Sequence, residues 1–103
     1  MLFIYKIQPA RDEAFAEGFT EFELQKVSEH FDYLKRLTDG GTVLLAGKTP
    51  NIPHRGFGIV IFKAESEESA RRVVDDDPAV RNKVFVAELY PFGVALSNGL
   101  IQP

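Results

Sequence analysis

Four segments of the chain carry apolar side chains at alternate or consecutive positions, the spacing that indicates β-strands. They cover residues 2–7, 42–47, 56–63 and 84–90. The first and third segments, LFIYKI and GFGIVIFK, are apolar on both faces. Strands with apolar side chains on both faces belong in the middle of a sheet and need cover on each side.

Two other segments have the 3.6-residue period of helices. The longer one is expected at about residues 20–39, where Thr20 and Glu23 have the spacing of a capping box and two glycines follow the end. At about 100° per residue, its apolar side chains form one stripe that we expect to be buried. The stripe consists of Leu24, Val27, Phe31 and Leu34.

The second helix begins after Ser66, a good N-cap, and ends in the acidic run 75–77. Asp77 followed by Pro78 has the pattern of an N-cap with proline at the first helical position, so a further short turn is expected through Val80. Residues 9–18 form an irregular connection in this interpretation, anchored by Phe15 and Phe19. Residues 48–55 form a loop, and the tail 93–103 is uninformative.

The order of these elements is βαββαβ, which predicts an α+β, ferredoxin-like fold with a four-stranded antiparallel sheet. The first and third strands lie in the centre of such a sheet, in agreement with their apolar patterns. Two helices cover only one face of the sheet. A second copy of the same sheet is the simplest cover for the other face, so we predict a homodimer whose sheets face each other.

Composition narrows the class of protein. The chain has 103 residues, 45% of them hydrophobic, which fits a single domain over residues 1–103. A net charge of −3 with scattered basic residues argues against a nucleic-acid partner. The apolar start meets Lys6 too early for a membrane span, so we expect a soluble protein. The absence of cysteine excludes thiolate chemistry and fits a cytoplasmic location.

His30 is the candidate for chemistry, because it lies on the flank of the apolar stripe. Histidine exchanges protons near neutral pH but needs an acid to orient its ring. Glu29 points away from His30 on the helix, so Asp77 is the better candidate. Two ordinary interpretations compete with this one: a hydrogen-bonded core histidine, and an aspartate that only caps a short helix.

Other polar residues suggest weaker sites. Lys26 and Tyr33 share the flank of His30, at positions i−4 and i+3, where such side chains normally reach for water. Pairing His30 with His54 would give a metal site without cysteine and without a recognisable ligand spacing, so no metal is expected. The glycines around Phe57 lack the rest of a dinucleotide-binding motif, and no cofactor is expected.

Several short motifs, in their order and spacing, resemble the YCII-related family over nearly the whole chain. They are Glu29-His30-Phe31, Tyr33-Leu34-Lys35, Gly41 with Leu44-Leu45-Ala46-Gly47, Phe57-Gly58-Ile59-Val60-Ile61-Phe62, Asp77-Pro78-Ala79-Val80 and Pro91-Phe92. The resemblance implies a dimeric α/β barrel in which His30 and Asp77 form a dyad. Relatives include a dehydrochlorinase, and the superfamily includes muconolactone isomerase and small cofactor-free oxygenases. Lys48 and Ala79 stand where better-known members often have proline and tyrosine.

Together, the residues and the resemblance predict a small-molecule enzyme without a cofactor. His30 would act as general base or acid and Asp77 would orient its ring, in a proton abstraction or elimination on a small organic acid. Lys26, Tyr33 and Arg55 are the candidates for holding the carboxylate. The alternatives are a non-catalytic dimeric module that binds a small molecule or serves an accessory role, and a small dimer in which His30 is structural.

Overall fold

The computed structural model describes residues 1–50 and 55–99, except the side chain of Phe15, so the predictions for that anchor and for His54 lie outside the described residues. It contains a four-stranded antiparallel sheet in the order β2-β3-β1-β4. The strands are β1 (Leu2–Pro9), β2 (Val43–Lys48), β3 (Gly58–Lys63) and β4 (Phe85–Phe92). The predicted α+β, ferredoxin-like fold is confirmed, with the two strands that are apolar on both faces in the centre.

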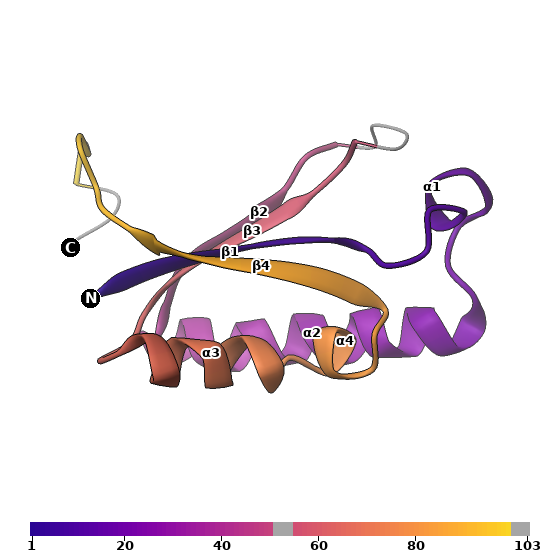
Figure 1. Ribbon diagram of the computed structural model, residues 1–103, viewed down its shortest axis with the longest axis horizontal. Helices are drawn as coiled ribbons and strands as arrows, with labels where there is room; N and C mark the ends of the chain where they lie inside the picture. Colours follow the sequence, from indigo (N-terminus) through magenta and orange to yellow (C-terminus); the bar gives the residue numbers. More distant parts are fainter. Residues whose placement is uncertain (51–54, 100–103) are drawn as a thin grey trace.

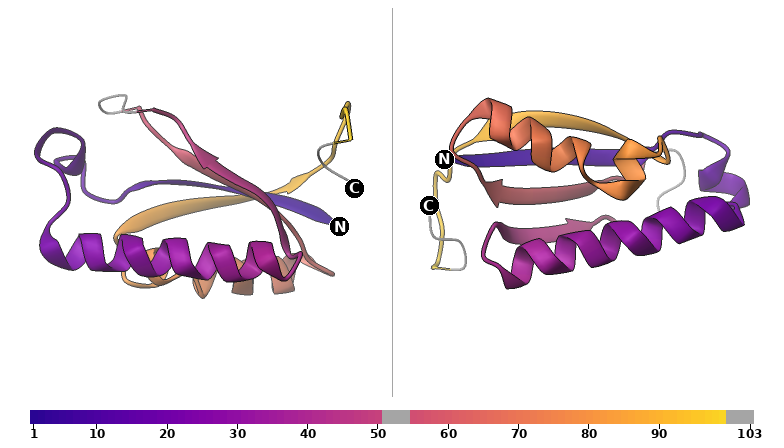
Figure 2. Two further views of the ribbon diagram at one scale, coloured as in Figure 1. Left: turned by 180° about the vertical axis from the view of Figure 1, so that it is seen from behind. Right: turned by 90° about the horizontal axis from the view of Figure 1, so that it is seen from below.

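Three helices form a second layer below the sheet, and no helix among the described residues covers the opposite face of the sheet (Figures 1 and 2). They are α2 (Glu21–Asp39), α3 (Glu67–Asp75) and α4 (Pro78–Arg81). The predicted capping box is present at Thr20, whose Oγ1 accepts a hydrogen bond from the backbone N–H of Glu23 while the Glu23 carboxylate accepts one from the N–H of Thr20. The connection predicted to be irregular contains one helical turn, α1 (Ala14–Glu17).

The core lies between the two layers, and strand pairing arranges it in rows. Phe3 of β1 pairs with Phe62 of β3, which pairs with Val43 of β2, and all three side chains are buried. The rings of Phe3 and Phe62 have centroids 6.0 Å apart. Cross-strand neighbours share one face of a sheet, so this row forms a continuous apolar layer below the sheet.

The predicted buried stripe of α2 is wrong at two of its four positions. Leu24 is 55% exposed and Phe31 is 65% exposed, whereas His30 and Leu34 are buried. The buried side of α2 is therefore rotated about the helix axis, away from Leu24 and Phe31 of the predicted stripe and towards His30. The physical reason is that α2 packs against α4 as well as against the sheet, so its contact arc includes the side chain that meets Asp77.

Three strands extend beyond the C-terminal ends that the sequence predicts. β1 continues to Pro9, β4 continues to Phe92, and β2 continues through Lys48, which was expected to begin a loop. In β2 the pairing shifts between Val43 and Leu45, after which Lys48 pairs with Gly58. This register places Lys48 in the same row as Ile7 of β1.

Candidate functional site

Asp77 occupies the N-cap of α4, where its side chain turns into the protein. The carboxylate Oδ1 accepts a hydrogen bond of 3.0 Å from the backbone N–H of Ala79, and Pro78 fills the first turn of the helix. This is the cap that the Asp-Pro step predicts. Its neighbours Asp75 and Asp76 are exposed, but Asp77 is 0% exposed. Asp77 therefore caps α4 and at the same time places a carboxylate in the core.

The structure brings the other oxygen of Asp77 to the side chain of His30. Asp77 Oδ2 lies 2.6 Å from Nδ1 of His30, although 47 positions separate them in the chain. It also accepts a hydrogen bond of 2.9 Å from the hydroxyl of Tyr5. Within the described residues, no buried side-chain nitrogen or oxygen lacks a partner. The carboxylate therefore sits among three donors, which compensates for its removal from water.

This pattern of donors fixes the tautomer of His30. An ionised carboxylate only accepts hydrogen bonds, so the proton of the neutral imidazole belongs on Nδ1. Nε2 then carries the free lone pair. His30 has no hydrogen bond from Nε2 to any described residue, and since no buried polar atom is unpaired there, this nitrogen is accessible. The arrangement can take a proton at Nε2 and stabilise the resulting imidazolium through Asp77.

Tyr5 is a member of this cluster that the sequence reasoning missed. It lies on β1 with no exposed surface. Burial, reinforced by the negative charge of Asp77, raises the pKa of its hydroxyl well above the ordinary value, so the hydroxyl remains a neutral donor. A tyrosine on a strand that is apolar on both faces is the signal that could have found it, because a buried hydroxyl requires a partner.

A cavity of about 590 Å³ opens next to His30, between α2 and the helix-facing side of the sheet. Its walls come from β1, α2, the ends of β2 and β3, and the start of β4. Among the described residues they are Ile7, Gln8, Pro9, Ala14, Phe19, Val27, His30, Phe31, Leu34, Ala46, Gly47, Lys48, Thr49, Pro50, Gly56, Phe57, Gly58, Ile59, Val60 and Phe85. The volume is in the range of small-molecule sites, roughly 300–1,000 Å³.

One wall of the cavity is a chain of rings in edge contact. The ring of His30 meets Phe85 edge-on, with centroids 5.1 Å apart and an interplanar angle of 85°. Phe85 in turn meets Phe19 at 6.1 Å and 65°. These contacts hold the imidazole plane between Asp77 on one side and the cavity on the other. The expected role of Phe19 as an apolar anchor of its segment is consistent with this contact.

The segment that carries Phe19 is held to α2 by an ion pair between Arg11 and Glu23. Arg11 donates to both carboxylate oxygens of Glu23, at 2.7 and 3.0 Å, and to the carbonyl of Gly18. The Arg11 guanidinium and the backbone N–H of Thr20 lower the pKa of Glu23 to about 2. A bidentate arginine–carboxylate pair fixes orientation as well as distance. It therefore holds this wall of the cavity in place.

The three predicted carboxylate-binding residues do not line the cavity. Lys26 forms an ion pair with Glu29 on the same helix, with Nζ 3.3 Å from the nearer carboxylate oxygen. Tyr33 donates its hydroxyl to the carbonyl of Val73 at 2.6 Å, and burial raises its pKa to about 12. Arg55 is exposed in the turn before β3. The titratable side chains that do line the cavity, among described residues, are His30 and Lys48.

The described part of the chain contains neither a metal-binding group of side chains nor a membrane-spanning helix. No group of three or more histidines and acids converges there in a way that could hold a metal ion. None of the helices described has both the length and the apolar character needed to cross a membrane.

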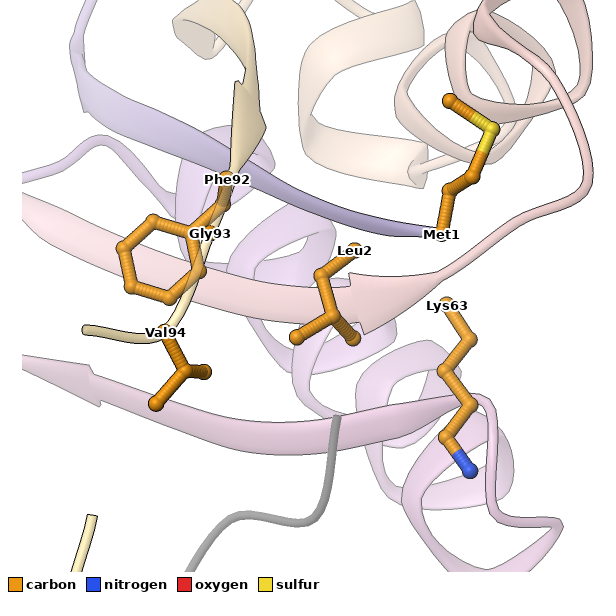
Figure 3. Close-up of a pocket in the computed structure, with 6 residues that line it drawn as sticks. All are labelled: Met1, Leu2, Lys63, Phe92, Gly93 and Val94. Atoms are coloured by element: carbon orange, nitrogen blue, oxygen red, sulfur yellow. The ribbon is translucent and has the colours of Figure 1, made fainter. Parts of the chain in front are cut away.

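A second hollow, of about 380 Å³, lies at the N-terminal end of β1 (Figure 3). Leu2, Lys63 and Phe92 share one row across β3, β1 and β4, and Gly93 and Val94 continue from β4. Leu2 is the neighbour of Phe3 in β1, and successive side chains of a strand point to opposite faces of the sheet. The row of Leu2 therefore faces away from the helices. This hollow contains none of the residues of the Asp77 cluster.

Comparison with known proteins places the fold among similar structures. The sequence model of the YCII-related domain matches residues 1–92. No curated protein matches the sequence significantly. A 5-chloro-2-hydroxyhydroquinone dehydrochlorinase from Burkholderia phenoliruptrix AC1100, solved in complex with 2,5-dihydroxybenzoquinone, is similar in structure with a TM-score of 0.67 and 18% identity. That match covers 90% of this chain and 94% of the other.

An uncharacterized protein from Thermotoga maritima is similar with a TM-score of 0.51 and 8% identity, over 89% of this chain and 95% of its own. At these identities the two structures establish a shared fold. The match to the family model extends from the first residue of β1 to the last residue of β4, so it includes every residue of the cluster around Asp77.

Proposed function

Since the chain belongs to the YCII-related family, whose domain covers residues 1–92, we propose that it processes a small organic molecule by acid–base chemistry at His30. The reaction is a proton abstraction or elimination that needs no cofactor. The observation that carries this proposal is the 2.6 Å contact between His30 Nδ1 and Asp77 Oδ2, with Nε2 of the same ring accessible at a cavity.

In this mechanism His30 Nε2 accepts a proton from an acidic C–H or O–H of the bound molecule. Asp77 stabilises the imidazolium that forms, and Tyr5 and the Ala79 N–H hold the carboxylate in place. In an elimination, the electron pair left on the substrate forms a new π bond while the leaving anion departs. In an isomerisation, His30 returns the proton to another atom of the same molecule. A positioned base of this kind contributes roughly 10²–10⁴-fold to rate.

The structural neighbour suggests the first compound to test. A dehydrochlorinase removes HCl, and 5-chloro-2-hydroxyhydroquinone is the compound named for that protein. We expect the purified chain to release chloride from it, or to exchange acidic C–H positions of related phenolic acids for deuterium in D₂O. His30→Ala should reduce either rate at least about 100-fold. Chloride is measured by ion chromatography and deuterium by NMR.

The matched control is Asp76→Asn, which removes a carboxylate one residue from Asp77 but outside the core. It should retain the wild-type rate. A His30→Ala variant as active as wild type would contradict the proposal. Ligands that bind in the cavity without proton exchange or product would instead favour the second candidate, a non-catalytic binding or accessory module that uses the same cavity.

We also propose that the protein is a homodimer whose sheets face each other. The face of the sheet without helices carries half-buried apolar side chains from neighbouring strands, including Ile4 and Ile59, and its edge strand exposes Val86 and Tyr90 by 55% and 49%. Sheets pack face to face at about 10 Å, so a second copy would bury these groups.

Sedimentation velocity tests the homodimer. We expect a species of twice 11.5 kDa at micromolar concentration. Val86→Glu places a charge within the proposed contact and should shift the protein to a monomer, while a change to glutamate at an exposed helix position, Leu24→Glu, should leave the dimer intact. A wild-type monomer would contradict this assembly.

A further inference from the structure

The described residues that line the cavity include one lysine, Lys48, and a second cation, Lys6, places its Nζ 4.8 Å from the centroid of the lining ring of Phe57. Of the described residues that line the cavity, none is acidic, although the chain as a whole has a net charge of −3. Lys48 and His30 are the titratable groups there. Lys48 forms no ion pair with any described residue, in contrast to Lys26 and Lys35, which pair with Glu29 and Asp39.

The register of the sheet explains why Lys48 lies over the cavity. Ile7, Gly58 and Lys48 form one row on the helix-facing side of β1, β3 and β2. The central member of this row has no side chain, so nothing separates the buried Ile7 from the stem of Lys48. A Cβ added at Gly58 would come within 3.0 Å of Ile7 Cγ1. The glycine therefore leaves room for the Ile7 side chain in this row, next to the cavity that Lys48 lines.

The apolar part of the cavity consists largely of rings. Phe19, Phe31, Phe57 and Phe85 all line it, and Phe31 is 65% exposed with Phe57 37% exposed. Flat aromatic molecules stack or meet such rings edge-on at little conformational cost. Burial of the two exposed rings by a ligand would also gain apolar contact.

From these observations we propose that the cavity binds a flat aromatic carboxylate, with its ring among the phenylalanines and its anionic group on Lys48. This inference rests on the proposed function, because it names the substrate class of the same cavity. Lys48 thus takes the part that the sequence suggested for Lys26, Tyr33 and Arg55. A lysine at this position selects for charge, and the four rings select for shape.

The test uses a pair of probes of the same shape and different charge, 2-naphthoate and its neutral amide, 2-naphthamide. Both are titrated into the ¹⁵N-labelled protein and followed by the amide signals of cavity residues such as Gly58. We expect 2-naphthoate to bind about fivefold tighter than the amide, the scale of one partly exposed ion pair. The difference should decrease in 0.5 M salt because the pair is screened.

Lys48→Met should reduce the affinity for 2-naphthoate about fivefold and leave the affinity for 2-naphthamide unchanged. Lys48→Arg keeps the positive charge and should retain the preference for 2-naphthoate. Lys63→Met is the matched control. It removes the same charge from an exposed strand lysine in the row that faces away from the helices, and it should change neither affinity.

Equal affinities of the two probes for the wild-type protein would overturn the assignment of Lys48, as would equal effects of Lys48→Met and Lys63→Met. Signal changes confined to other parts of the sheet would overturn the site itself. Charge-dependent binding without any proton exchange would leave the role of Lys48 intact while contradicting the proposed catalysis, so the two can fail separately.

Discussion

The two ends of the interface between sheet and helices differ in the side chains that fill equivalent rows of the sheet. At one end, Phe3, Phe62 and Val43 fill the row and the layers are in close contact. At the other end, two rows along, Ile7, Gly58 and Lys48 occupy the equivalent places, and a cavity of about 590 Å³ remains. The cavity thus lies where a glycine stands in the central strand in place of a phenylalanine, beyond the register shift in β2.

The helix α2 runs along both ends of this interface, and its side chains pack in the core at one end and border the cavity at the other. Leu37 packs against the closed core, whereas His30, two turns earlier, borders the cavity and contacts Asp77. A polar cluster next to a packed core has rigid support, which keeps the imidazole in one orientation. The closed end should therefore determine stability, and the open end should determine binding and chemistry.

The largest effect on stability is expected at the closed end. Phe62→Ala removes a fully buried ring that contacts Phe3 and Tyr5, and should lower the free energy of unfolding by about 3–5 kcal/mol. Phe31→Ala, at the open end, should change it by about 0.5 kcal/mol or less, because that ring is exposed. Urea denaturation measures both. Similar losses for the two variants would remove the distinction between the ends.

The next effect is expected at the boundary between the ends, where Asp77 lies. Asp77→Asn replaces one acceptor oxygen by an N–H₂ group, which leaves at least one of its three donors without a partner. We expect a loss of about 1–3 kcal/mol. The same change at the exposed Asp76 should be nearly neutral. If Asp77→Asn unfolds at the same urea concentration as wild type, the carboxylate does not hold the cluster together.

A smaller effect on stability is expected where the row opens. Gly58→Ala adds a Cβ at 3.0 Å from Ile7, so the Ile7 side chain must shift, and we expect a change of about 1 kcal/mol or less. The same methyl group enters the cavity beside Lys48 and should weaken binding of 2-naphthoate. Gly93→Ala, where an added Cβ meets nothing within 4 Å and which does not line the cavity, is the control. Unchanged binding by Gly58→Ala would mean that this row does not form the cavity floor.

The last effect concerns alkaline pH. Burial raises the pKa of Tyr33 to about 12 and that of Tyr5 still further, whereas tyrosines of the unfolded chain ionise near 10. The unfolded state therefore loses protons first, and stability that is complete below pH 10 should decline between pH 10 and 12. Tyr33→Phe should make this decline shallower. The slope against pH, taken from urea denaturation, is the quantity to compare, and an unchanged slope would contradict the assignment.

The sequence predicted much of this arrangement, because the relevant signals are local. Strand alternation identified the two central strands, the Thr20 spacing located the start of α2, and the Asp-Pro step located the cap at Asp77. Each of these follows from neighbouring residues and backbone geometry. The contact of His30 with Asp77 was a hypothesis to which the resemblance added weight.

What the sequence did not predict depends on how elements meet. The buried arc of α2 includes His30 instead of Phe31 because α4 packs beside it, which no helical period can show. Tyr5 contacts Asp77 only because β1 of the sheet and the start of α4 in the helix layer come together in the fold. Lys48 was assigned to a loop, since the pairing that continues β2 depends on its partner Gly58. Contacts between elements distant in the chain decided all three.

The most direct test of the central claim, that the open end presents a base at Nε2 of His30, is the tautomer of that ring. Long-range ¹H–¹⁵N NMR distinguishes the two nitrogens, at a pH where the imidazole is neutral. Because Asp77 accepts from Nδ1, we predict that the proton resides on Nδ1 and that Nε2 carries the lone pair. A neutral ring with its proton on Nε2 would leave no base at the cavity and would contradict the account.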